Sequence, residues 1–285
     1  MSGQLKIRVA KGAGFCFGVR DAIAKAKETA QEHGKVYMLG DIVHNERVVA
    51  ELEQDNIKVV DSLDQARDAP VLFRAHGTVP ELWKKANEKD LTIVDATCPL
   101  VHEIHDEIRK LHEEGRKLLI IGDHGHDEVI AIQAQVPDTT VIATIEEAKQ
   151  VPRIKKAGLV SQSTQMIENV QEILGILSMK IFDLRFVNTV CFPTRRNQDE
   201  IKSIAPISDV MIIIGSQTSA NTKRLLEASL RLNKNSYMVE TAEEVDPEWF
   251  KGASSVGVSA GASSPDDLIE EVVEQLKHIN VKMEV

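Results

Sequence analysis

Three cysteines are the residues in this sequence whose type and spacing most readily suggest chemistry. Cys16, Cys98 and Cys191 recur about every 90 residues, a length near the small end of domain sizes. Each follows a short apolar run and a turn, in the stretches KIRVAKGAGFC, LTIVDATC and LRFVNTVC. A stretch with helical periodicity comes next in each case. This repeated context predicts three equivalent positions at the carboxyl ends of strands, where ligand sites form in α/β sheets.

Several kinds of site use cysteine. A single cysteine is most often a small buried core residue, and zinc sites usually show a close pair such as C-x-x-C. A catalytic nucleophile requires one cysteine, not three. Three thiolates can instead hold an iron–sulfur cluster, and a cluster of four irons would then keep one iron open to bind substrate and deliver electrons. Gly14 and Gly18 would provide a positive φ or a close approach, and Phe15 and Phe17 would exclude water.

Histidines and small polar residues follow other predicted strands. His44, His76, His124 and His126 lie in polar turns of this kind, and histidine can donate hydrogen bonds to phosphate. Two C-terminal loops add hydroxyl and amide groups at helix starts, as in anion sites: Ser216, Thr218, Ser219, Asn221, Ser259, Gly261, Ser263 and Ser264. Taken singly, each has an ordinary explanation as a surface histidine or a helix cap. Together they suggest one pocket for an anionic ligand.

Glu128, two residues after His126, is a candidate proton relay near the open iron. Exposure at a helix start is the competing explanation. The SQST stretch, Ser161–Thr164, either places hydroxyls in the same cavity or caps the next helix. The sequence has no Walker-type GKS/T and no spaced acidic cluster, so it gives no indication of a magnesium–nucleotide site.

Apolar runs and amphipathic stretches alternate along the chain. The predicted strands are Lys6–Ala10, Val36–Leu39, Val71–Arg74, Thr92–Asp95, Lys117–Ile121, Thr140–Ala143, Gly158–Ser161, Leu184–Asn188, Val210–Ile214, Ser236–Val239 and Val256–Ser259. The predicted helices are Arg20–His33, Glu46–Gln54, Glu81–Lys89, Val101–Glu114, Glu128–Gln135, Ile167–Leu177, Arg196–Ile204, Thr222–Leu232 and Pro265–His278. Ser264 and Pro265 are expected to be the N-cap and first residue of the last helix.

This alternation predicts an α/β fold with mostly parallel sheets. We expect three similar α/β lobes packed around one shared centre. Their predicted bounds are 12–97, 98–190 and 191–285, with the N-terminal strand 1–11 joining the third lobe.

Composition excludes several classes of protein. The chain has 285 residues, of which 42% are hydrophobic and 27% charged, which is typical of a globular protein. A formal net charge of −10 disfavours a general affinity for nucleic acid or anionic membrane. No apolar run is long enough for a membrane span, and the N-terminus lacks a signal-peptide pattern, so we expect a cytoplasmic protein. In that reducing compartment three cysteines do not form a disulfide scaffold.

Taken together, these motifs resemble those of one family, the LytB/IspH family of 4-hydroxy-3-methylbut-2-enyl diphosphate reductases. The matching stretches are GFCFGV, VHN, AHG, DATCPLV, GHDEV, SQST, the Cys191–Gln198 loop, the Ser216–Leu225 loop and AGASSPD, in the family's order. The resemblance implies three α/β lobes arranged pseudo-threefold around a central 4Fe–4S cluster. It also implies the last step of the non-mevalonate isoprenoid pathway, in which the substrate loses its allylic hydroxyl and becomes isopentenyl or dimethylallyl diphosphate.

The resemblance also implies a role for each matching residue. Cys16, Cys98 and Cys191 would ligate the cluster and leave one iron open. The diphosphate would bind to His44, His76, His126, Ser219, Asn221 and Ser263. Glu128 would deliver protons, with Thr164 and Ser163 orienting the substrate hydroxyl or a bound water. A ferredoxin- or flavodoxin-like protein would donate the electrons.

Four features depart from the family's usual pattern. Ala220 stands where serine is common, Ser163 where threonine is usual and Asn197 where arginine is usual, and VIAIQAQ replaces VEGTMGQ after Glu128. These changes keep two alternatives open. One is a paralogue with the same cluster and another phosphorylated allylic substrate, and the other is a non-catalytic cluster-binding sensor.

Overall fold

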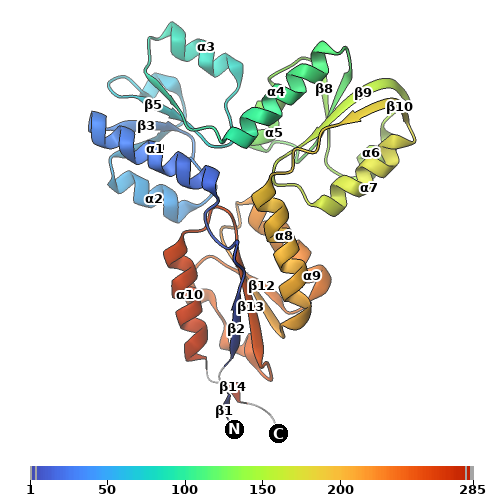
Figure 1. The fold of residues 1–285 in the computed structure, drawn as a ribbon. Helices are drawn as coiled ribbons and strands as arrows, with labels where there is room; N and C mark the ends of the chain where they lie inside the picture. Colours follow the sequence, from blue (N-terminus) through green and yellow to red (C-terminus); the bar gives the residue numbers. More distant parts are fainter. Residues whose placement is uncertain (1, 4, 280, 283–285) are drawn as a thin grey trace. The chain divides into compact units, whose positions relative to one another are not determined.

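The protein was analysed as a computed structural model that describes residues 2–3, 5–279 and 281–282. Residues 1, 4, 280 and 283–285, which fall in the predicted N-terminal strand and third lobe, lie outside the described residues. Three parallel sheets of four strands each form the framework, and a short antiparallel pair joins β1 (Ser2–Gly3) to β14 (Val281–Lys282) (Figure 1). The predicted fold class, three similar α/β lobes with parallel sheets, is confirmed.

The described chain divides into two compact units. The first comprises Met1–Phe17, His44–Val48 and Phe192–Val285, and the second comprises Gly18–Val43 and Val49–Cys191. The second unit therefore contains two of the three four-stranded sheets. The bounds predicted for three separate lobes stay a prediction.

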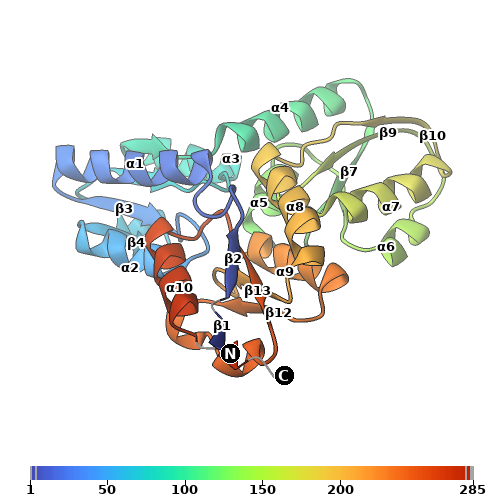
Figure 2. The same cartoon turned by 60° about the horizontal axis from the view of Figure 1, so that its bottom comes forward.

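The sheet of the first unit has the order β12-β11-β13-β2. Its strands are β2 (Lys6–Val9), β11 (Val210–Ile214), β12 (Ser236–Val239) and β13 (Ser255–Ala260). Helix α10 (Asp266–His278) covers one face, and α8 (Phe192–Ile204) and α9 (Ala220–Leu232) cover the other (Figures 1 and 2). Alternate β11 residues, Val210, Ile212 and Ile214, pack with Val272 and Leu276 of α10. Burial of both faces explains the continuous apolar run of β11.

One sheet of the second unit has the order β4-β3-β5-β6. Its strands are β3 (Val36–Leu39), β4 (Ile57–Val60), β5 (Val71–Phe73) and β6 (Ile93–Asp95). The helices that belong to it are α1 (Phe17–His33), α2 (Glu46–Gln54) and α3 (Pro80–Glu88). Phe73, Val71 and Leu39 form a buried core with Ala86 of α3. The carboxyl end of β5, which precedes His76, is therefore held by packed apolar side chains.

The other sheet of the second unit has the order β10-β9-β7-β8. Its strands are β7 (Lys117–Ile121), β8 (Thr139–Ile142), β9 (Ile154–Ser161) and β10 (Ile181–Phe186). Helices α6 (Ile145–Gln150) and α7 (Ile167–Ser178) pack on one face. Helices α4 (Pro99–Glu113) and α5 (Asp127–Gln133) pack on the opposite face (Figure 2).

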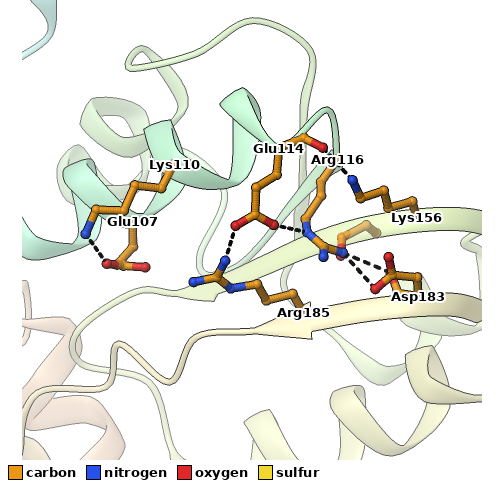
Figure 3. Close-up of polar contacts among 8 residues, drawn as sticks. Glu107, Lys110, Glu114, Arg116, Lys156, Asp183 and Arg185 are labelled. Atoms are coloured by element: carbon orange, nitrogen blue, oxygen red, sulfur yellow. Dashed lines mark hydrogen bonds and ion pairs between the residues drawn. The ribbon is translucent and has the colours of Figure 1, made fainter.

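A network of ion pairs anchors the C-terminal end of α4 to this sheet (Figure 3). Glu114, the C-cap residue, pairs with Arg116 and Arg185. The hydrogen bond from Arg116 lowers the pKa of the Glu114 carboxyl. Arg116 also donates to the Asp183 carboxylate at 3.0 Å, and Lys156 donates to the backbone carbonyl of Glu114. This network lies at the C-terminal end of α4, whereas Cys98 lies at its N-terminal end as the N-cap residue. The ion pairs therefore hold the orientation of the helix that follows Cys98.

Most predicted elements are present within a few residues of their expected bounds, and the differences have local causes. Strand β4 and helix α6 were not predicted; helix α6 has only six residues, too few for a clear helical periodicity. Strand β9 begins at Ile154 instead of Gly158. Pro265 is the N-cap of α10 and not its first residue, and Ser264 caps nothing because its hydroxyl donates to Ile214 O at 2.9 Å.

No helix in the described part of the chain is both long and apolar enough to cross a membrane.

Candidate functional site

All three cysteines have the same backbone setting. The amide of Cys16 donates to Ala262 O at 3.1 Å, that of Cys98 to Ala75 O at 3.1 Å, and that of Cys191 to Ser163 O at 2.9 Å. Each acceptor lies in a loop that carries another predicted site residue: Ser263, His76 and Ser163 itself. The equivalence expected from the sequence is therefore present in the local geometry of each lobe.

Each cysteine directly precedes a helix. Cys16 is followed by α1, Cys98 by α4 and Cys191 by α8. The first amide groups of a helix carry partial positive charge, which stabilises a nearby anion such as a thiolate or an anionic cluster. The sequence predicted later starts for these three helices, and the earlier starts bring a helix N-terminus to every cysteine.

Two glycines around Cys16 have different reasons for lacking a side chain. Gly14 has a φ of +100°, in the region that favours glycine. Gly18 has no such strain, but a Cβ placed on it would lie 2.5 Å from Cys98 Sγ and 3.3 Å from Cys98 Cβ. The backbone of α1 thus leaves a space that the Cys98 thiol fills, which suits a thiol that must keep a fixed position.

The donor set also fits an iron–sulfur cluster chemically. None of the three cysteines forms a disulfide, and all are half-buried. Cys16 belongs to the first unit, and Cys98 and Cys191 to the second. In the described ranges, no group of three or more His, Cys, Asp or Glu side chains is gathered as a metal site, so the three-cysteine ligand set stays a prediction.

Five buried side-chain polar atoms in the first unit have no hydrogen-bond partner among the described residues. One is Arg8 Nη1 on β2, and the other four are Asn221 Nδ2, Thr222 Oγ1, Ser259 Oγ and Ser263 Oγ. These four lie at the carboxyl end of β13 or at the start of α9. A buried donor without a partner costs about 1–3 kcal/mol, so several in one place indicate a site for a ligand with many acceptor atoms. Asn221 and Ser263 were predicted site residues, whereas Thr222 was missed because it reads as an ordinary helix residue.

The short segment His44–Val48 is bound tightly to this part of the first unit. Buried Asn45 donates to Ser263 O at 2.9 Å and accepts from Val48 N at 3.2 Å. Glu46 accepts from Ser216 Oγ at 2.8 Å and Thr218 Oγ1 at 3.1 Å. The pKa of Glu46 is lowered by its backbone hydrogen bond and by the Ser216 hydroxyl. These contacts fix half-buried His44 in the same unit as Ser263.

Some predicted ligand residues have structural partners instead. Ser219 is the N-cap of α9, and its hydroxyl accepts from Thr222 N at 3.3 Å. The hydroxyl groups of Ser216 and Thr218 donate hydrogen bonds to the Glu46 carboxylate. His124 pairs with Glu147 at 3.0 Å on the surface.

In the second unit, Glu128 and Ser163 form a closed pair of hydrogen bonds. Glu128 is 2% exposed, although it lies in the first turn of α5. One of its carboxylate oxygens accepts from Ser163 N at 2.6 Å and the other from Ser163 Oγ at 2.8 Å. Thr164 follows in the same turn and is half-buried. The Glu128 side chain is therefore buried, and the competing explanation that it is exposed at the start of a helix is wrong.

His126 is the N-cap residue of α5 and lies beside His76. Its Nδ1 accepts from Glu128 N at 3.1 Å, so the neutral ring carries its proton on Nε2. The rings of His76 and His126 meet edge to face with centroids 5.9 Å apart. Arg74, two residues before His76, donates to Asp127 at 2.8 Å, and this ion pair joins the end of β5 to the start of α5.

The departures from the family pattern lie mostly in the supporting structure. Asn197 is buried, and a Cβ on Gly12 would lie 2.2 Å from its Oδ1. Ala220 is the first residue of α9 and is half-buried. Within VIAIQAQ, Val129 and Ile132 belong to the core beneath α5.

Comparison with known proteins assigns these features to one class, the iron–sulfur oxidoreductases of isoprenoid biosynthesis. The model of the "LytB protein" family matches residues 7–277, so the chain belongs to this family. The chain is 40% identical to the 4-hydroxy-3-methylbut-2-enyl diphosphate reductase of Geobacter metallireducens over 97% of this chain and 98% of that protein. It is 38% identical to the Aquifex aeolicus enzyme of the same name, with 97% of each chain covered.

Two solved structures agree with this assignment. One is (E)-4-hydroxy-3-methylbut-2-enyl diphosphate reductase, described as the terminal enzyme of the non-mevalonate pathway, with a TM-score of 0.70, 38% identity and coverage of 96% of this chain and 100% of that one. The other is the E-1-hydroxy-2-methyl-but-2-enyl-4-diphosphate reductase of Plasmodium falciparum, with a TM-score of 0.93, 25% identity and coverage of 99% and 92%. The predicted family and enzyme class are confirmed.

Proposed function

We propose that this protein reduces (E)-4-hydroxy-3-methylbut-2-enyl diphosphate to isopentenyl and dimethylallyl diphosphate in the cytoplasm. The reaction takes two electrons and two protons, breaks the allylic C–O bond, forms a C–H bond and releases water. A ferredoxin- or flavodoxin-like protein supplies the electrons. The family and its full-length relatives support this activity.

The observation that carries the substrate class is the group of unpartnered donors in the first unit. A diphosphate offers acceptor oxygens to Asn221 Nδ2 and Ser263 Oγ, and ionised acceptors give hydrogen bonds about twice as strong as neutral ones. Ser219 supports this site as the cap of α9, whose N-terminus favours an anion. His44, His76 and His126 are the further diphosphate ligands of the proposal.

Cys16, Cys98 and Cys191 would hold a 4Fe–4S cluster with one open iron. When bound, the cluster supplies electrons and a Lewis-acidic iron for the substrate hydroxyl. The chain's own contribution is to hold each thiol at a helix start through its backbone amide. Gly18 keeps the space of the Cys98 thiol open.

Glu128 is the proposed proton donor. The two hydrogen bonds from Ser163 fix the orientation of its carboxylate, and its burial excludes bulk water from the proton path. Once Glu128 is protonated, it can deliver the proton to the leaving hydroxyl or to carbon. Thr164, next in the same turn, is placed to orient that hydroxyl or a bound water.

The two alternatives are less well supported. A non-catalytic sensor gives no role to the unpartnered donors of the first unit or to buried Glu128. A paralogue with another substrate would need different substrate-binding residues. Ala220, however, lies next to the N-cap of α9, and Asn197 packs against Gly12, so neither change alters a proposed diphosphate ligand.

The activity is tested with anaerobically purified, reduced protein and the hydroxymethylbutenyl diphosphate. We expect about four irons per chain and formation of both isoprenoid diphosphates. Absence of both products from protein with a full cluster would overturn the proposal.

The diphosphate site is tested separately with inorganic diphosphate as the probe. Asn221→Ala removes one hydrogen bond to a charged group and should weaken binding about 10- to 100-fold. Asn235→Ala, on the exposed side chain at the start of β12, is the matched control. Equal affinity of both variants would remove Asn221 from the site.

A further inference from the structure

Two phenylalanines of the first unit form an exposed stack. The rings of Phe17 and Phe192 are parallel to within 3° with centroids 5.4 Å apart. Both remain open to solvent, at 41% and 58% exposure. Single exposed apolar residues are common, but two large rings stacked on each other at the surface form a preformed apolar contact. Phe17 is therefore partly open to solvent, and the shielding role expected for it from the sequence stays a prediction.

The position of this stack relates it to the proposed cluster. Phe17 directly follows Cys16, and Phe192 directly follows Cys191. Each ring is also the first residue of a helix, α1 or α8. The exposed apolar pair is thus one residue away along the chain from two of the three proposed cluster ligands.

Exposed basic residues lie near the stack along the chain in the same unit. Arg196 is one helical turn after Phe192 on α8, is exposed, and donates to Gly12 O at 3.3 Å. Lys11, the residue before Gly12, is exposed as well. Glu200, one turn further along α8, accepts from Gly12 N at 2.8 Å. Exposed Asp21 and Asp199 also lie on α1 and α8, but the Glu200 carboxylate is engaged by Gly12 N. In a chain with a net charge of −10, exposed Lys11 and Arg196 are therefore basic groups near the stack that would attract an acidic partner.

We propose that Phe17, Phe192, Lys11 and Arg196 form the docking surface for an acidic protein that carries one electron at a time, an inference that rests on the proposed function. Substrate reduction takes two electrons, so the carrier must dock twice in each turnover. At each encounter the carrier is oxidised by one electron, and the second completes C–O cleavage with uptake of two protons and release of water. Transient partners of this kind use small interfaces with aromatic and arginine contacts at the centre and charge for rapid association.

The test compares two reductants on the same variants. Reduced acidic ferredoxin requires docking, whereas reduced methyl viologen is a small molecule that does not. Phe192→Ala and Arg196→Glu should each lower kcat/KM for ferredoxin about tenfold or more and leave the rate with methyl viologen within about twofold. Phe182→Ala is the matched control, because Phe182 is 92% exposed on β10 of the other unit.

Binding provides a readout that does not depend on turnover. The Kd of oxidised ferredoxin for each variant, measured by anaerobic calorimetry, should rise in parallel with the loss of kcat/KM and should depend more weakly on salt in Arg196→Glu. Unchanged Kd and kcat/KM in both variants would overturn the docking surface and leave the proposed function intact. Parallel loss of methyl viologen activity and iron content would assign the pair to packing and also overturn it. A wild-type protein that makes no product with either reductant would instead overturn the proposed function.

Discussion

Replacement of Gly18 by alanine tests whether the Cys98 thiol has a fixed place. Gly18 is the second residue of α1, where alanine is favoured by up to about 1 kcal/mol in helical conformation. The new Cβ would lie 2.5 Å from Cys98 Sγ, whereas ordinary van der Waals contacts begin at 3.4 Å. The sulfur must therefore move by about 1 Å. Cys98 Cβ, 3.3 Å away, is close to an acceptable contact.

Rotation of Cys98 about χ1 is the least costly way to relieve this overlap. It moves the sulfur to another staggered position at a cost of order 1 kcal/mol, which the gain in helix propensity largely offsets. We therefore expect Gly18→Ala to change the Tm by no more than a few degrees. The thiol, however, leaves its position, and iron per chain after anaerobic reconstitution should fall by at least about half.

Gly175→Ala is the matched control. Gly175 lies inside α7, and nothing lies within 4 Å of a Cβ placed there. This variant should gain up to about 1 kcal/mol of stability and keep its full iron content. Full iron content and an unchanged visible spectrum in Gly18→Ala would refute the reasoning, since the thiol would then have no fixed place to lose. Loss of folded structure in Gly18→Ala would refute it equally, because rotation would not have relieved the overlap.

Three further predictions follow from the second unit. Glu128→Gln should keep iron content and diphosphate affinity while turnover falls about 100-fold, and unchanged turnover would remove Glu128 from the mechanism. Arg74→Gln and Asp127→Asn should each raise KM, with a coupling of about 1 kcal/mol in the double-mutant cycle; additive effects would show that the ion pair does not position the histidines. Burial, and then the charges of His102 and Arg109, lower the pKa of His105 to about 4, although Asp106 and Asp95 act in the opposite direction. Because this histidine binds a proton below about pH 6.5 in the unfolded chain but not in the folded one, the free energy of unfolding should fall by about 2 kcal/mol between pH 7 and pH 5. Urea unfolding followed by Trp83 fluorescence in a Trp249→Phe background should show this loss, and a His105→Gln variant with the same pH dependence would contradict it.

The sequence predicted the elements whose signals are local. The run Val210–Ile214 matches β11 to the residue because an uninterrupted apolar run between turns is sufficient to define a strand buried on both faces. Gly14 and Gly18 were also informative, since a glycine beside a cysteine reports a backbone requirement directly. The capping of α10 was mispredicted because the hydroxyl of Ser264 bonds to β11, which is distant in sequence.

Residues that act through distant partners gave no such signal. Asn45 contacts Ser263, and Arg74 contacts Asp127, across long stretches of sequence. Thr222 reads as an ordinary helix residue until its buried hydroxyl is found without a partner in the described structure. Burial of Glu128 was equally hidden, because a glutamate in the first turn of a helix is normally exposed. Each of these features depends on contacts between segments that are distant in sequence, and the periodicity of apolar residues carries no information about such contacts.

The departures from the family pattern bear differently on affinity and on substrate class once their positions are known. Asn197 fills space against Gly12, and Val129 and Ile132 fill space beneath α5, so these residues act on the scaffold. Ala220 can remove at most one hydroxyl beside the cap of α9, whereas Asn221 and Ser263 retain their buried donors. In the proposed site a different substrate would have to satisfy those same donors, whereas a diphosphate would do so with ionised oxygens. We therefore expect the substitutions to alter how tightly the substrate is held and how fast it reacts, and we expect the buried donors of the proposed site still to select a diphosphate.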